Sequence, residues 1–417
     1  MKIENLSALS EKFVERVNHF PELIKKYPVE LLLGVTYTLL GLIAVLGNGF
    51  ISSKKAEIIT SYVPVLALAF FLNRPRIKVL YYASFFICLV LVFFLEKLSG
   101  QQWFVIYFIA FLLLFMSRSK SNANFLTQVE CVASSLFYTC LIEMVLIVLL
   151  FFIGWSVYTL LGGDKSVEGI MLCVCLPVAP VAFILSVEVF SSKGGSIVLS
   201  ALLKYVFSPA LVIYSLILYV YSVKIIVTYQ LPNGGVAYMV LSYVSIALGT
   251  YMLSSSWEKN PFRWFYRWFP FISIVPMLLL WSGLARRLSD YGFTQERVYL
   301  LALTIVYSLF LVMLMFERTR RFQYLIVALI IGAFVLTYVP GISAKDIAIR
   351  NQKQRLESVL PVVTIDGFFR EPDVEKIKKD PELEKSWRKA QGAYEYLQKH
   401  KQLSEYEHYG KWHYRYW

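Results

Sequence analysis

The chain has 417 residues, of which 58% are hydrophobic and only 17% charged, and its formal net charge at pH 7 is +13. This composition excludes a disordered protein and an ordinary soluble one. The mean hydropathy is +0.59 despite a long charged C-terminal segment, so the apolar residues must be concentrated in blocks. Because these blocks are continuous rather than alternating, they predict transmembrane helices and not the strands of a barrel.

The apolar blocks divide the chain into three parts. Residues 1–30 are polar and contain no apolar core of a signal peptide, so we expect a cytoplasmic N-terminal segment. Residues 31–340 are predicted to form an all-α transmembrane bundle, and residues 341–417 a small α-rich tail outside the cytoplasm. Eleven spans are expected, at residues 31–50, 57–73, 79–95, 103–117, 131–153, 168–187, 198–221, 235–254, 269–285, 298–316 and 322–340.

The fifth apolar run, residues 125–161, is longer than one span requires. We interpret it as one crossing followed by an interfacial segment with Trp155 and Tyr158, because aromatic side chains favour the headgroup level. Two crossings are the alternative, and they would reverse the orientation of everything that follows. With one crossing, lysine and arginine are more frequent on the side of the N-terminus. This predicts a multi-pass protein of a bacterial inner membrane, with its N-terminus cytoplasmic and its C-terminus outside.

The connection between the ninth and tenth spans, Ala285–Tyr299, is rich in charge and falls on the outer side in this topology. One interpretation is an ion-paired turn, in which Asp290 and Glu296 neutralise the neighbouring arginines. The other is a binding cluster of Arg287, Tyr291, Thr294 and Arg297. Guanidinium groups bind carboxylate or phosphate in a bidentate manner, so the ligand would be an anionic solute, a lipid headgroup or acidic residues of the tail.

Ionisable residues inside spans are hypotheses for function by default. Glu143 in the fifth span and Lys204 in the seventh have opposite charges. They predict either a structural role, as an ion pair or as charges that reach a wet crevice, which we favour, or a proton or ion relay. Glu130 and Glu188 lie near span ends, and we expect both to reach water.

Prolines interrupt several spans, and each removes a backbone hydrogen-bond donor. Such breaks are tolerated in membranes where the freed backbone groups are buried in protein or line a cavity. The sequence positions are Pro64, Pro177, Pro180, Pro209 and Pro276.

Other motifs mainly exclude functions. The five cysteines lie in apolar runs and the four histidines outside them, so we expect no metal site. No phosphate-binding loop, dinucleotide fingerprint or nucleophile elbow is present, so we predict no cofactor and name no catalytic residue. Residues 257–271 mix aromatic residues with Arg263 and Arg267. This pattern is typical of a membrane interface with anionic lipid and does not favour nucleic acid. The sequence leaves a protein partner unknown.

The tail predicts two helices with an extended piece between them. KDIAIRNQKQRLESVL favours the first helix, PVVTIDGFF an extended segment with a turn at Asp366-Gly367, and the second helix begins with Asp380 as N-cap and Pro381. In the bundle, Thr294 is expected at the N-cap of the tenth span, with Glu296 in its first turn.

Two segments resemble a bacterial integral-membrane family, domain of unknown function 4153. Its signature is Arg, a short gap, Tyr-Gly-Leu-Thr, two residues and Arg. Arg287, Tyr291–Thr294 and Arg297 are similar to it, with Phe293 in place of leucine. The segment DIAIRNQKQRLE is similar to the piece that follows the membrane region in that family, with Asn351 and Arg355 at its recurring positions. The resemblance implies fold and location and no activity.

Three functions remain open. The first is a permease-like protein for a solute or lipid. The second is a non-catalytic envelope or signalling component that acts through its tail. The third is a membrane enzyme on a lipid-linked substrate, which requires a catalytic carboxylate near the arginines, such as Asp290, Glu296 or Asp366.

Overall fold

The fold is almost entirely helical, as the composition predicts. A computed structural model describes residues 20–46, 55–73, 77–94, 98–116, 122–161, 166–193, 195–228, 235–254, 260–316, 321–365, 368–369, 380–404 and 406. Within these residues one short antiparallel hairpin accompanies the helices, formed by β1 (Thr364–Ile365) and β2 (Phe368–Phe369).

Each predicted span falls on a helix. The helices are α3 (Pro28–Leu46), α5 (Lys55–Leu72), α6 (Lys78–Phe94), α7 (Gly100–Met116), α8 (Asn122–Leu161), α9 (Ser166–Lys193), α10 (Ile197–Leu202) with α11 (Ser208–Thr228), α12 (Gly235–Ser254), α14 (Ile274–Tyr291), α15 (Gln295–Met315) and α16 (Phe322–Tyr338). In the described part of the chain, six helical stretches are long and apolar enough to cross a membrane, and four further apolar helices are shorter. The chain is therefore helical, with several helices of the kind found in membrane proteins, whereas the multi-pass topology and the eleven crossings remain predictions.

Residues 125–161 lie within a single helix, α8. It is one continuous helix of 40 residues, which corresponds to a length of about 60 Å. A helix without a turn cannot cross and return, so the alternative of two crossings is wrong. Its second half exposes large apolar side chains such as Leu149 and Phe152, as a surface against lipid requires. The helix includes Trp155 and Tyr158, whose side chains lie outside the description.

The chain divides into two units, and each is described by itself. The first comprises residues 1–209, 249–262 and 321–326. In it, α9 packs along α8 and α3, and α5 contacts α3, α6 and α7. The apolar core between α3 and α5 includes Leu33, Tyr37 and Tyr62, all of which are buried.

Helix α9 continues through both of its prolines, and at Pro180 a tyrosine replaces the missing donor. Pro180 has no N–H for the carbonyl of Leu176, four residues earlier. The hydroxyl of Tyr62 on α5 donates to that carbonyl instead. Gly34 on α3 allows the close approach, since a Cβ atom there would stand 3.0 Å from the Pro180 ring.

The seventh predicted span is not a regular α-helix. Residues Leu203–Phe207 form a π-helical turn between α10 and α11. Pro209 cannot donate to the carbonyl of Tyr205, and the wider turn accommodates this defect. Ser208 closes the turn, because its backbone N–H and its hydroxyl both donate to the carbonyl of Leu203.

The second unit comprises residues 210–248, 263–320 and 327–417. Here the predicted span at 269–285 falls on α13 (Arg263–Ile272) and α14, which together form one of the six stretches long and apolar enough to cross a membrane; only Ser273 interrupts them. Ser273 itself keeps a helical backbone conformation. Its hydroxyl donates to the carbonyl of Phe269 and does not cap α14. Pro276 leaves the carbonyl of Ile272 without its helical donor, and the hydroxyl of Tyr219 on α11 supplies it at 2.9 Å.

The tail is built from α17 (Ala344–Glu357), α18 (Leu360–Val363), the hairpin and α20 (Pro381–Lys399). Its apolar core joins α17 and α18 to α20 and includes Leu356, Val363 and Trp387. The predicted N-cap Asp380 is confirmed, since its carboxylate accepts from two backbone amides. The segment predicted as extended begins with the short helix α18, and its expected turn at residues 366–367 lies outside the described residues.

Candidate functional site

The predicted charged connection forms a tight turn between α14 and α15. Helix α14 ends at Tyr291, and Gly292 follows with φ 70° and ψ −170°, a conformation that is essentially restricted to glycine. A Cβ atom at Gly292 would stand 2.4 Å from Cδ of Arg355 and 2.7 Å from Oδ1 of Asn351. Glycine is therefore required twice, for its backbone conformation and for the approach of α17.

Two side chains of α17 bind the backbone of this turn. Oδ1 of Asn351 accepts from the N–H of Phe293 at 2.9 Å. Nε2 of Gln352, which is buried, donates to the carbonyls of Tyr291 at 3.1 Å and of Phe293 at 2.7 Å. The turn and the first tail helix thus lie at the same end of α15 and α16, which connect them along the chain.

Arg355 caps the C-terminal end of α14. Its guanidinium donates to the carbonyls of Ser289 at 3.3 Å and of Asp290 at 2.8 Å. The last carbonyls of a helix lack intrahelical donors and carry partial negative charge, so a cation there is favourable. Two segments separated by about 60 residues in sequence, both part of the family resemblance, therefore meet in one contact.

The four residues predicted as a binding cluster have different roles. Arg297 donates to the carbonyl of Gly292 at 2.9 Å, and its guanidinium lies 5.2 Å from the ring centre of Tyr291. Arg287 lies 5.4 Å from the ring centre of Tyr238. It makes no hydrogen bond or ion pair with the described residues. Thr294 occupies the N-cap of α15 as predicted, but its side chain makes no capping bond.

The charge balance around the turn is positive. Burial lowers the pKa of Arg355, and the positive charge of Arg297 lowers it further, while Asp290 opposes this effect. Asp290 is itself an exposed partner of Arg286, with 3.7 Å between the charged atoms. Among the described residues, acidic groups therefore compensate only part of the positive charge, and the cluster is suited to bind an anion.

The two charges predicted inside spans are Glu143 of α8 and Lys204. One carboxylate oxygen of Glu143 is buried and has no hydrogen-bond partner. Lys204 lies in the π-helical turn, a type of distortion that is frequent at functional sites.

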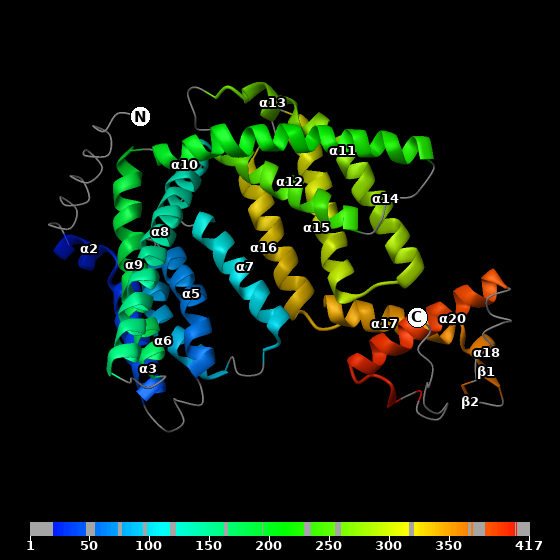
Figure 1. Cartoon of the computed structure of the whole chain (residues 1–417), viewed down its shortest axis with the longest axis horizontal. Coiled ribbons are helices and arrows are strands. Elements are labelled where there is room, and N and C mark those ends of the chain that lie inside the picture. Colours follow the sequence, from blue (N-terminus) through cyan, green and yellow to red (C-terminus); the bar gives the residue numbers. More distant parts are fainter. Residues whose placement is uncertain are drawn as a thin grey trace. The chain divides into compact units, whose positions relative to one another are not determined.

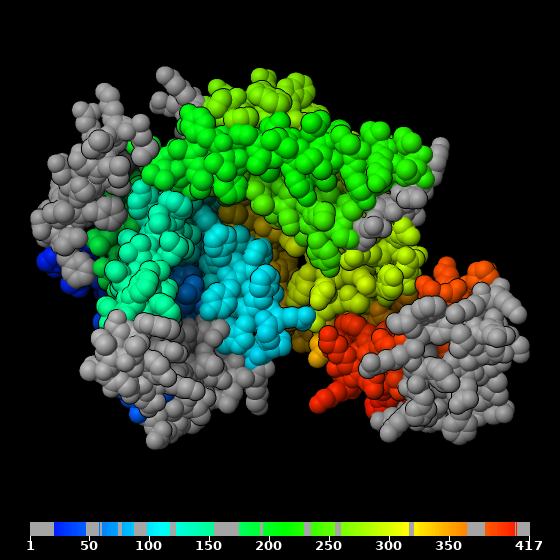
Figure 2. Space-filling model, viewed as in Figure 1, coloured from blue at the N-terminus to red at the C-terminus, as the bar shows by residue number. Residues whose placement is uncertain are grey.

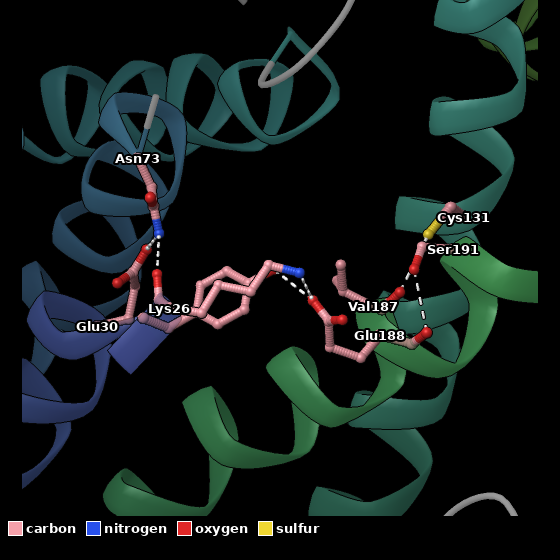
Figure 3. A network of polar contacts seen from close by, with 8 residues as sticks. Lys26, Glu30, Asn73, Cys131, Val187, Glu188 and Ser191 are labelled. Carbon is pink, nitrogen blue, oxygen red and sulfur yellow. Dashed lines mark hydrogen bonds and ion pairs between the residues drawn. The ribbon is translucent and has the colours of Figure 1, made fainter. Parts of the chain in front are cut away.

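The first unit also holds a buried polar network that the sequence did not reveal (Figure 3). Glu188 of α9 accepts from the ammonium group of Lys26 at 2.5 Å and from the hydroxyl of Tyr27 at 2.8 Å. The expectation that Glu188 and Glu130 reach water is wrong, because each residue is only 8% exposed. The interaction with Lys26 replaces water as the partner of the Glu188 carboxylate.

A pocket of about 350 Å³ lies beside this network, at the first turns of α8 and the end of α9. Its wall combines apolar and polar side chains: Phe70, Asn124, Thr127, Gln128, Cys131, Val132, Val187, Phe190 and Ser191. Two hydrogen bonds fix this wall, from the thiol of Cys131 to the carbonyl of Val187 and from the hydroxyl of Ser191 to the carbonyl of Glu188. In the part of the chain with described placement, no three potential metal ligands come together.

Comparisons with known proteins add one relative. The chain is 31% identical over 176 residues to an uncharacterized protein of Pasteurella multocida, and this match covers 42% of the chain. The match spans only 30% of that relative's length. No protein-family model matches the chain, and no solved structure matches it. Membership of domain of unknown function 4153 therefore stays a prediction.

Proposed function

We propose that this protein is a permease-like membrane protein that binds an anionic solute or a lipid headgroup at the turn between α14 and α15. In this proposal it resides in a bacterial inner membrane, with the turn and the tail outside the cytoplasm. The carboxylate or phosphate of the ligand is bound by Arg287, with Arg297 adding positive charge.

The proposal rests on the different contacts of the three arginines at the turn. Arg355 and Arg297 donate to backbone carbonyls and stabilise the turn. Arg287 is half-buried, stacks on an aromatic ring and makes no ion pair with the described residues. A guanidinium that is held in place and has unused donors is a suitable anion site.

Binding of inorganic phosphate and of short-chain phosphatidylglycerol to the purified full-length protein tests the site. Arg287→Gln removes the proposed ligand-binding group, and Arg286→Gln is the matched control, since Arg286 pairs with Asp290. We expect Arg287→Gln to weaken binding at least about tenfold, the value of one charged hydrogen bond. Binding of phosphate alone indicates a solute, and binding of the lipid alone indicates a headgroup. Equal affinity of the two variants would refute the site.

Flux measurements test the permease role separately. We propose that Glu143 and Lys204 contribute to the path of the solute or lipid through the first unit. Glu143→Gln and Lys204→Met in proteoliposomes are expected to reduce flux of whichever ligand the binding assay identifies. Unchanged flux in both variants would count against transport while leaving the binding site intact.

A second candidate function is a non-catalytic envelope or signalling component that acts through the tail. The tail supports it, because α17, α18 and α20 share their own apolar core. Photocrosslinking from Glu395, an exposed position on α20, is expected to capture a protein partner in membranes. If the flux of the ligand is normal and no protein is captured, this candidate is excluded.

The third hypothesis, an enzyme on a lipid-linked substrate, depends on a carboxylate beside the arginines. Asp290 is paired with Arg286, Glu296 is exposed in the first turn of α15, and Asp366 lies outside the described residues. Alanine at all three positions without loss of phenotype would remove this hypothesis.

A further inference from the structure

Helix α13 presents two different faces along only ten residues. Phe265, Tyr266, Phe269 and Pro270 are buried. The opposite face exposes two Arg-Trp pairs, one helical turn apart, with Trp264 at 55% and Trp268 at 56% exposure. The exposed residues are Arg263, Trp264, Arg267, Trp268 and Phe271.

The buried face fixes α13 to the second unit. The ring of Phe269 packs on that of Tyr243 of α12 at 6.1 Å. Tyr243 is in turn hydrogen-bonded to Ser215 of α11 at 2.6 Å. At the end of α13, the carbonyl of Ile272 accepts from Tyr219 of α11. The exposed face is therefore held in one orientation and is not a mobile segment that could bury itself.

Helix α13 lies at the end of a helix that is long enough to cross a bilayer. Figure 1 shows that α13 lies across the end of α14 and α15 and does not continue the line of α14. Helix α14 has 18 residues, a length of about 27 Å, close to the thickness of the hydrocarbon core of a bilayer. If α14 spans the bilayer, α13 lies at one surface and the turn at Gly292 at the other.

The chemistry of the exposed face selects the kind of partner. Neither Arg263 nor Arg267 makes an ion pair with any residue that the structure describes, and α13 contains no acidic residue. Tryptophan favours the level of the lipid headgroups, and arginine binds phosphate groups. In the space-filling view, α13 lies at the surface of the second unit (Figure 2).

We infer that α13 is an in-plane anchor whose Arg-Trp face binds the phosphate groups of anionic phospholipids. The lipids belong to the leaflet opposite the α14–α15 turn. This site is independent of the proposed anion site at Arg287 and lies at the other end of α14. Binding at this face orients the second unit in the membrane, and this orientation depends on the content of anionic lipid.

The test uses the full-length protein in nanodiscs that contain a photoreactive phosphatidylglycerol with its reactive group in the headgroup. Cross-linked positions are mapped by mass spectrometry, and a photoreactive phosphatidylcholine serves as the neutral probe. We expect cross-links at residues 260–272 with phosphatidylglycerol, and their yield falls with added salt. Arg263→Gln with Arg267→Gln is expected to lower this yield about fivefold for each arginine and about 25-fold together.

The matched control is Lys385→Gln with Arg388→Gln, which removes the same charge from exposed positions on α20. It is expected to leave the yield at α13 unchanged, and Arg263→Lys with Arg267→Lys retains most of it. An equal yield with both lipid probes would overturn the inference, and so would an equal loss in the two glutamine variants. A protein cross-linked to α13 in cell membranes, with no preference for the anionic lipid, would show that this face binds protein instead.

Discussion

Replacement of Gly292 by alanine tests how the tail is attached to the membrane region. The conformation with φ 70° and ψ −170° costs a non-glycine residue about 1–3 kcal/mol. The new Cβ atom would also displace Arg355 and Asn351, which approach to 2.4 and 2.7 Å. Losing their hydrogen bonds adds about 2 kcal/mol. The expected loss of stability is thus about 3–5 kcal/mol, measured by thermal unfolding in detergent and by proteolysis between α16 and α17.

Gly341→Ala is the matched control, because Gly341 also has a positive φ, 83°, but no atom within 4 Å of its added Cβ. It is expected to cost only the backbone strain, about 1–2 kcal/mol. Arg355→Ala should cost less in the Gly292→Ala background than in the wild type, since the same bonds are already lost. The reasoning is wrong if the two glycine variants are equally stable, or if the effects at Gly292 and Arg355 simply add.

Three other predictions concern single side chains. Tyr62→Phe leaves the carbonyl of Leu176 without a donor in the apolar interior and is expected to lower the free energy of unfolding by about 1–3 kcal/mol. Adding Pro180→Ala restores a backbone N–H and should recover most of this loss. No recovery would contradict the conclusion that Tyr62 supplies the donor that Pro180 lacks. Gln352→Leu removes the donor to two carbonyls of the turn and should release α17 to protease, whereas Gln354→Leu, at an exposed position of the same helix, should not. Burial, together with nearby lysines, lowers the pKa of His400 below its ordinary 6.5. The unfolded chain therefore binds this proton more tightly, and the stability of the fold decreases as pH falls through 6.5. His400→Gln should remove this part of the pH dependence of unfolding, and an unchanged profile would exclude His400 as its source.

The sequence predicted the helices well, because long apolar runs leave few other structures in a membrane. It did not indicate the interruption between α13 and α14, since hydropathy is continuous across Ser273 and the buried face of α13 looks like the start of a span. The prolines were expected to disrupt α9 and α14. What could not be foreseen is that tyrosines on other helices, such as Tyr62 and Tyr219, supply the missing donors.

The candidate site was predicted in its composition but not in its contacts. Asn351 and Arg355 were named from the family resemblance, and nothing in their spacing indicates the backbone of a turn some 60 residues earlier. Gln352 was missed, because a glutamine on a helix carries no signal for burial. Glu188 was expected in water for a similar reason, as its partner Lys26 is remote in sequence.

In the contact between α17 and the turn, α17 contributes side chains and the turn contributes main-chain atoms. Every hydrogen bond from Asn351, Gln352 and Arg355 to the turn ends on an amide or a carbonyl. The side chains of Ser289 and Asp290 can therefore change in related proteins without loss of the attachment. Inserting or deleting one residue between them and Phe293 would shift every acceptor and detach the tail.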